Sequence, residues 1–397
     1  MRHFSYLGAK KTSALFHSLP QQFSRESPAP LLAVALGATL YSPGTRTNLA
    51  ADVVKQAGRG STSIVLCLED SVADGDVERA EQNVVSALRK LSGRTESARS
   101  VPLPLLFVRV RTPQQMLSIA ERAGVGLDLL SGFVVPKFDN RLGYAERFLD
   151  ALHTIHERHG QGGGDGRRRL RIMPILESDV MIHIESRQSA LVDVQALLRE
   201  NRDDILAVRI GATDFSSTFG LRRSRDLNIY DVKVVSAVIA DIVNILGRRD
   251  DGFVITGPVW EHFANTERLL RPQLRLTPFA ESNDEKLRRR LLTKNFDGLM
   301  HEIALDQANG LQGKTVIHPS HVAVVHSMSV VSHEEFLDAE AIAGNVGGGA
   351  AASPYGNKMN EMKPHQAWAE RTLLRAAAFG VAAEDVSYVD LLEASMR

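Results

Sequence analysis

Short apolar runs alternate with amphipathic segments along most of the chain, and this alternation restricts the fold more than any other feature. Strand-like runs lie at 31–41, 63–68, 103–110, 132–136, 170–176, 205–210, 252–256 and 315–317. Segments with helical periodicity lie at 48–57, 77–91, 113–123, 145–156, 188–200, 231–246, 283–308 and 332–342. Eight strand–helix alternations of this spacing predict an α/β chain folded as a closed (β/α)₈ TIM barrel rather than an open doubly wound sheet.

The flanking segments suggest how the rest of the chain is organised. We expect an N-terminal extension at 1–30, the barrel domain at 31–343, and a glycine-rich linker with a C-terminal helical tail at 344–397. The tail helices are predicted at 363–379 and 383–393, and their apolar faces are candidates for a subunit contact. A glycine-rich stretch at 160–169 falls between a helix and a strand, at the bottom of the expected barrel, so we interpret it as a solvated connector.

Charge and composition limit the partners and the compartment. The 47 basic and 47 acidic residues balance, so neither nucleic acid nor an anionic membrane is expected as a partner. No apolar run is long enough for a membrane span, and the single cysteine, Cys67, is typical of a reducing, cytoplasmic setting. Residues 1–24 are basic and weakly similar to a mitochondrial presequence; alternatively, Phe4, Leu15 and Phe16 dock on the barrel.

Two strands within 169–220 end in a carboxylate, Glu177 in LRIMPILES and Asp214 in ILAVRIGATD. A charged residue in a strand buried on both faces is costly unless it lies at the open end. Paired carboxylates at one barrel mouth suit Mg²⁺, which takes one or two carboxylates and keeps positions for substrate oxygens. The alternative is that Glu177 caps a helix and Asp214 is an ordinary loop acid.

The other predicted strands also end in charged or polar side chains, at the face where barrel enzymes carry their chemistry. These residues are Arg46, Glu69, Asp70, Arg109, Arg111, Lys137 and His318. Lys137 and Asp70 could simply pair with each other, and His318 could be a loop histidine bonded to backbone. Arg109 is harder to explain as scaffold, because a guanidinium on an apolar strand needs an anionic partner.

The strand-end motifs, taken in order, resemble the citrate lyase β-subunit group, which is similar to malyl-CoA lyases and the HpcH/HpaI aldolases. The motifs are LYSPG at 40–44, LED at 68–70, VRV at 108–110, PK at 136–137, LES at 176–178, GATDFSSTFG at 211–220 and GKTVIHPS at 313–320. The resemblance implies that Glu177 and Asp214 hold Mg²⁺ and that Arg109 contacts substrate oxygens. It also implies that Glu69 and Asp70 support the site and that the protein is a homo-oligomer, a trimer or a multiple of it.

The chain departs from that pattern at several positions. Typical members carry an arginine where this chain has Gly37-Ala38-Thr39, so Arg46 is a candidate replacement. They also carry a catalytic aspartate on a C-terminal segment that reaches a neighbouring subunit, where Glu361 is the nearest equivalent. These departures resemble a bacterial branch associated with tellurium-resistance-type gene clusters. Lys137, Arg111 and His318 remain candidate substrate-binding residues, and the proton carrier is Glu361, His318 or a metal-bound water.

Three functional hypotheses follow from the sequence. The first is a Mg²⁺-dependent carbon–carbon lyase acting through an enolate on an acyl-CoA thioester or a related small carboxylic acid. The second is an aldolase or hydrolase that acts on a small oxo acid without coenzyme A. The third is a barrel that has lost turnover and serves as a binding or assembly subunit.

Overall fold

The computed structural model describes residues 1–94, 101–159, 169–263, 296–345 and 347–396. Eight parallel strands form one sheet in the order β8-β7-β6-β5-β4-β3-β2-β9. They are β2 (Ala38–Pro43), β3 (Ser63–Cys67), β4 (Leu105–Arg109), β5 (Leu130–Val135), β6 (Arg171–Leu176), β7 (Val208–Ile210), β8 (Ile255–Thr256) and β9 (Lys314–Val316). A parallel bridge between Gly257, directly after β8, and Lys314 of β9 joins the two edges of the sheet. The predicted (β/α)₈ barrel is confirmed.

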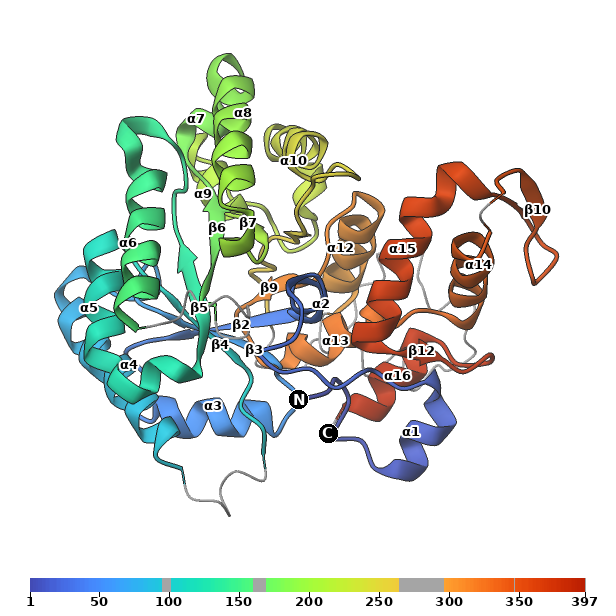
Figure 1. The fold of residues 1–397 in the computed structure, drawn as a ribbon, viewed down its shortest axis with the longest axis horizontal. Helices are drawn as coiled ribbons and strands as arrows, with labels where there is room; N and C mark the ends of the chain where they lie inside the picture. Colours follow the sequence, from blue (N-terminus) through green and yellow to red (C-terminus); the bar gives the residue numbers. More distant parts are fainter. Residues whose placement is uncertain (95–100, 160–168, 264–295, 346, 397) are drawn as a thin grey trace.

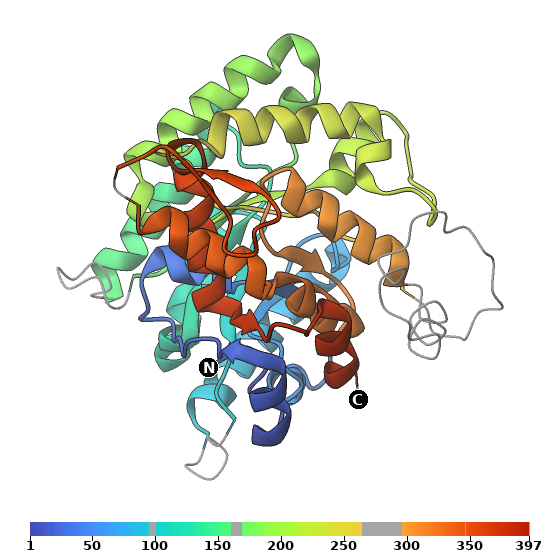
Figure 2. The same ribbon diagram turned by 90° about the vertical axis from the view of Figure 1, so that its right-hand side faces the viewer.

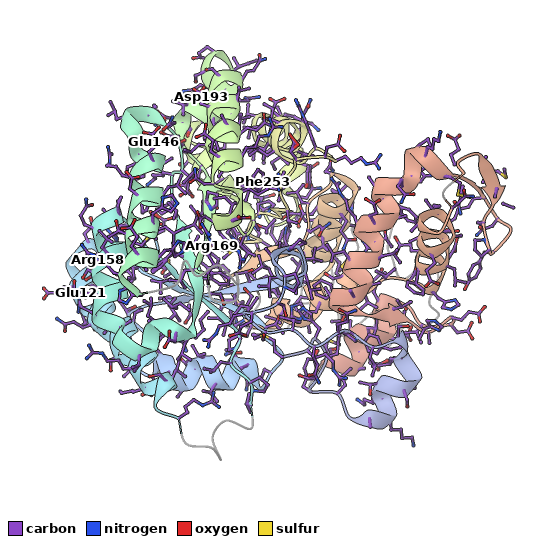
Figure 3. The ribbon with its side chains drawn as sticks, viewed as in Figure 1. Glu121, Glu146, Arg158, Arg169, Asp193 and Phe253 are labelled. Carbon is purple, nitrogen blue, oxygen red and sulfur yellow. The ribbon has the colours of Figure 1, made fainter. Side chains whose placement is uncertain are left out.

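Helices cover the outside of the strands (Figure 1). They are α3 (Leu49–Ala57), α4 (Val77–Ser92), α5 (Pro113–Ala123), α6 (Tyr144–His159), α8 (Ile184–Glu200), α10 (Lys233–Leu246), α12 (Phe296–Ala308) and α13 (Ser320–Ser329). Charged side chains such as Glu121 on α5 and Arg158 on α6 project from the outer surface (Figure 3). The predicted helix at 283–308 is described only from Phe296, and residues 160–168 of the predicted connector lie outside the described residues.

The bottom of the barrel is closed by a helix that the sequence did not reveal. The predicted strand at 31–41 is wrong in its first half, where α2 (Ala29–Ala35) forms instead and only Ala38–Pro43 is a strand. A proline at the start of α2 suits a helix beginning, and its apolar run fits a fully buried helix as well as a buried strand. Residues of α2 pack with Val65, Phe107 and Met173 of the barrel interior.

The N-terminal residues dock under the barrel beside α2. Phe4 and Phe16 are buried in a small apolar cluster with Leu391, whereas Leu15 is only partly buried. The chain then forms β1 (Phe16–Ser18), which pairs antiparallel with β12 (Val381–Ala382) near the other end of the sequence. Figures 1 and 2 show these segments side by side, next to α1 (Ala9–Leu15) and α16 (Tyr388–Ser395).

A second helical layer is attached to one side of the barrel (Figure 2). It consists of α14 (His333–Ala343) packed against the long α15 (Met362–Phe379), with Ala339, Ile342 and Ala369 buried between them. The stretch expected to be a linker forms a hairpin of β10 (Ala350–Ala352) and β11 (Met359–Glu361). Within the described residues, no helix is long and apolar enough to cross a membrane.

Candidate active site

Six of the predicted site residues converge at the carboxyl ends of neighbouring strands. Glu69 and Asp70 follow β3, Arg109 ends β4, Lys137 follows β5, and Glu177 follows β6. Asp214 lies in the first turn of α9 (Ala212–Thr218), directly after β7. We refer to these six residues as the carboxylate–arginine cluster.

Arg109 is the centre of the cluster. Its Nη2 lies 2.6 Å from Glu69 Oε2, 3.1 Å from Asp70 Oδ2 and 3.2 Å from Glu177 Oε1. Burial alone would lower the pKa of Arg109, but the nearby Glu177, Tyr41 and Glu69 outweigh this effect and raise it. The guanidinium is therefore a fixed positive charge at the mouth of the barrel.

Glu177 is the most deeply buried carboxylate of the cluster, with 4% of its surface exposed. Its Oε1 accepts hydrogen bonds from Arg109 and from the backbone N–H of Lys137, at 3.2 and 3.0 Å. Lys137 adopts a left-handed backbone conformation with φ of 48°. Burial raises the pKa of Glu177 to about 8, with the charges of Asp214 and Glu69 adding to the shift and Arg109 opposing it.

Asp214 completes the cluster next to Glu177. Burial and the charge of Asp70 raise the pKa of Asp214, while Arg109, Lys137 and a hydrogen bond with Glu177 oppose the rise. The Lys137 ammonium lies 3.8 Å from Glu69 Oε1 on the other side. Asp214 and Glu177 are thus two adjacent carboxylates held near the low-dielectric floor of the mouth.

The cluster has the composition of a divalent-cation site. When all four carboxylates, on Glu69, Asp70, Glu177 and Asp214, are ionised, they exceed the two cations, on Arg109 and Lys137, by two charges, which a divalent cation would balance. Gly211 leaves space beside Glu177, since a Cβ at this position would overlap the Glu177 carboxylate. In the described ranges, no group of three or more His, Cys, Asp or Glu side chains is placed so that it could hold a metal ion. Two carboxylates with water ligands are what Mg²⁺ commonly uses.

The remaining predicted site residues lie outside the carboxylate–arginine cluster. Arg111 holds the loop after β3, donating to the carbonyls of Leu68 and Val72 and pairing with Asp74 at 2.5 Å. Arg46 pairs with Asp52 at 2.6 Å on the loop after β2.

His318 and Glu361 also lie apart from the cluster. The His318 ring stacks on Phe263 with centroids 4.8 Å apart, and its Nδ1 contacts Ser320 Oγ at 2.7 Å. Glu361 is exposed on the hairpin strand β11, and no ion pair or hydrogen bond among the described residues joins it to the cluster.

A buried ion network that the sequence did not reveal fixes two loops at the mouth. Arg223, in the loop after α9, pairs with Glu302 of α12 and donates to the Val259 carbonyl in the loop after β8. Lys314 of β9 lies 2.9 Å from Glu302 Oε1 and 2.6 Å from Asp306 Oδ2. Residues so far apart in sequence give no local signal of pairing. The network anchors the loops after β7 and β8 to the barrel wall.

The geometry defines a barrel enzyme with an acidic, arginine-centred site at the carboxyl ends of its strands. The family model for carbon–carbon bond lyases of the TIM-barrel fold matches residues 30–381. The chain belongs to this family and is a carbon–carbon bond lyase. No curated protein sequence matches the chain.

Solved structures support the same fold at low sequence identity. A citrate lyase from Burkholderia xenovorans is 16% identical, with a TM-score of 0.60 over 90% of this chain and 96% of that one. The magnesium and glyoxylate complex of Haloferax volcanii malate synthase is 14% identical, with a TM-score of 0.53 over 90% of each chain.

Proposed function

We propose that the protein is a Mg²⁺-dependent lyase that cleaves or forms a carbon–carbon bond through an enolate. The proposed substrate is an acyl-CoA thioester or a related small carboxylic acid. The observation that carries the proposal is the contact of Arg109 with Glu69, Asp70 and Glu177, beside Asp214, at the barrel mouth. Malate synthase, which shares the fold, forms a complex with magnesium and glyoxylate, and this supports the proposal of a magnesium-dependent reaction.

The residues of the cluster divide into two proposed roles. Glu177 and Asp214 would hold the metal, which supplies a positive charge to the carboxylate and carbonyl oxygens of a bound acid. Arg109 would donate to the oxygen on which negative charge develops as the bond breaks. Its position is fixed in advance by Glu69 and Asp70, so little reorganisation is needed during the reaction. Lys137 lies at the entrance, where it can attract an anionic substrate.

None of the six residues of the carboxylate–arginine cluster is proposed as the proton carrier. Glu361 is exposed on a hairpin and makes no contact with the cluster within the described residues, so its proposed catalytic role requires the mouth of a neighbouring subunit. A homo-oligomer is therefore part of the proposal. His318 and a metal-bound water are the other proposed proton carriers.

Calorimetric titration with Mg²⁺ tests the proposal on wild type, Glu177→Gln and Asp214→Asn. We expect wild type to bind Mg²⁺ and each variant to lose at least about tenfold in affinity, because each removes one of two carboxylate ligands. Glu185→Gln, an exposed carboxylate in the first turn of α8, is the matched control and should bind as wild type does.

The same titration with acetyl-CoA and a panel of oxo acids separates the substrate classes. Tightening of Mg²⁺ binding by the thioester supports the acyl-CoA lyase. Tightening by an oxo acid alone supports the aldolase that does not use coenzyme A. If Mg²⁺ binds equally to wild type and both carboxylate variants, the proposed metal site is wrong.

A further inference from the structure

Arg209, on strand β7, lies inside the barrel below the carboxylate–arginine cluster, with only 1% of its surface exposed. Its Nη2 lies 2.6 Å from Thr315 Oγ1, and its Nη1 lies 3.3 Å from Thr39 Oγ1 and 3.7 Å from Met173 Sδ. These partners are two hydroxyls and a thioether, and all of them are uncharged.

The charge of Arg209 has no carboxylate to balance it. No Asp or Glu in the described part of the chain lies within ion-pair distance, and the buried Nε has no hydrogen-bond acceptor there. Burial accordingly lowers the pKa of Arg209 below its ordinary value. A cation removed from water without a partner costs several kcal/mol in general, so packing does not account for an arginine at this position.

Tyr41 connects Arg209 to the site. The Arg209 guanidinium lies 5.5 Å from the centroid of the Tyr41 ring, and it also interacts with the Tyr41 hydroxyl. Tyr41 packs on the barrel interior but remains partly exposed, unlike Arg209. Arg109 and Glu177 are near enough for their charges to act on Tyr41. A guanidinium only donates hydrogen bonds, so the phenol oxygen can accept from Arg209 while its own proton points elsewhere.

We propose that Tyr41 and Arg209 together bind an anionic oxygen of the substrate at the floor of the site. The Tyr41 hydroxyl donates to this oxygen, and Arg209 is a positioning residue that orients the ring and supplies the positive charge. The proposal rests on the proposed function, since the oxygen belongs to the acid bound beside Arg109. The ligand class is a compact dianion with oxygens on adjacent carbons, such as an oxo acid in its enolate form.

Calorimetry with Mg²⁺ followed by oxalate tests the inference on the full-length protein. Oxalate is a dianion with oxygens on adjacent carbons. The variants are Arg209→Met, which keeps an unbranched apolar side chain but removes the guanidinium and its charge, Arg209→Lys, Tyr41→Phe and the double variant Tyr41→Phe/Arg209→Met. The control is Arg171→Met. Arg171 is the first residue of strand β6, at the end of the strand away from Glu177 and the site.

We expect Arg209→Met and Tyr41→Phe each to weaken oxalate binding by about ten- to a hundredfold, the effect of losing a hydrogen bond to a charged group. The double variant should lose no more than the larger single loss, because the two residues act as a unit. Arg209→Lys should recover part of the affinity, and Mg²⁺ binding should stay within about threefold of wild type. The melting temperature of Arg209→Met should not fall, since the variant removes an unbalanced buried charge.

Two results would overturn the inference while the proposed function stands. One is wild-type oxalate affinity in Arg209→Met with Mg²⁺ bound. The other is a parallel loss of oxalate affinity and melting temperature that Arg209→Lys does not relieve, which would show a purely structural role. Absence of both Mg²⁺ and oxalate binding in wild type would overturn the inference together with the proposed function.

Discussion

At the scale of single residues, the site depends on how closely Gly211 approaches Glu177. A Cβ at position 211 would overlap the Cβ and Oε2 of Glu177, and Glu177 is fixed from the other side by Arg109 and the Lys137 N–H. We predict that Gly211→Ala displaces the Glu177 carboxylate and weakens Mg²⁺ binding by at least about tenfold, with native helix content by circular dichroism.

Gly75→Ala is the control for this substitution. Gly75 lies in the loop after β3, and a Cβ there would meet no atom within 4 Å. Equal Mg²⁺ affinity in Gly211→Ala and Gly75→Ala would show that the Gly211 contact does not position the ligand.

The sequence located the cluster because each member lies at the end of a strand or within a few residues after it. The same reasoning could not separate Arg109 from Arg111, which both stand at the end of β4. The strand ends at Arg109, and the chain then turns, so Arg111 folds back onto the loop after β3. Arg209 was not predicted as a site residue. It is also an arginine within an apolar strand, which is the feature that singled out Arg109.

At the scale of elements, the network between α12 and β9 fixes the wall of the barrel. Lys314 lies between Glu302 and Asp306, and all three side chains are almost fully buried. We predict that Lys314→Met lowers the free energy of unfolding by about 3–5 kcal/mol, because the buried Asp306 loses its counter-charge and Glu302 keeps only that of Arg223. Chemical denaturation measures this loss.

Lys358→Met provides the comparison at the surface. Lys358 also lies between two acids, Glu334 and Asp338, but almost half of its side chain is exposed. Its removal should cost less than that of Lys314, about 1–2 kcal/mol, because Glu334 is exposed to water and the buried Asp338 keeps the hydrogen bond from Asn360. If Lys314→Met and Lys358→Met lower the free energy of unfolding by similar amounts, the burial of Lys314 does not determine how much its ion pairs stabilise the protein.

The elements themselves were predictable where periodicity was clear. Helix α5 begins and ends at the predicted residues, because Thr112 caps it, Pro113 starts it and one face is apolar. Helices α2 and α13 were missed, since both are buried on nearly all sides and carry no amphipathic pattern. The hairpin at 350–361 was also hidden, because its residues match a flexible linker in composition.

At the scale of the whole molecule, stability depends on neutral histidines under the barrel. His326 Nε2 accepts the Ala38 N–H at 3.2 Å, and its ring lies 4.4 Å from that of His3. Burial lowers the pKa of His326 to about 3. Burial, His326 and the amino group of Met1 also lower the pKa of His3, while its bond to the Ala35 carbonyl opposes them.

These histidines predict a loss of stability in acid. An unfolded histidine takes up a proton near pH 6.5, whereas folded His326 stays neutral down to about pH 3. As the pH falls through this range, the free energy of unfolding should fall by up to about 1.4 kcal/mol per pH unit for each such group. His326→Gln, which keeps an acceptor but does not titrate, should flatten this dependence in urea unfolding. Parallel pH profiles for the two proteins would contradict the prediction.

The pairing of β1 with β12 joins residues near the start of the chain to residues near its end. During synthesis, the ribosome releases Phe16 long before Val381 exists, so β1 has no partner while the barrel strands are being made. The underside of the barrel therefore closes last, after the C-terminal helices have left the ribosome. A chain terminated before Val381 would leave β1 unpaired and would expose an apolar surface to chaperones and proteases.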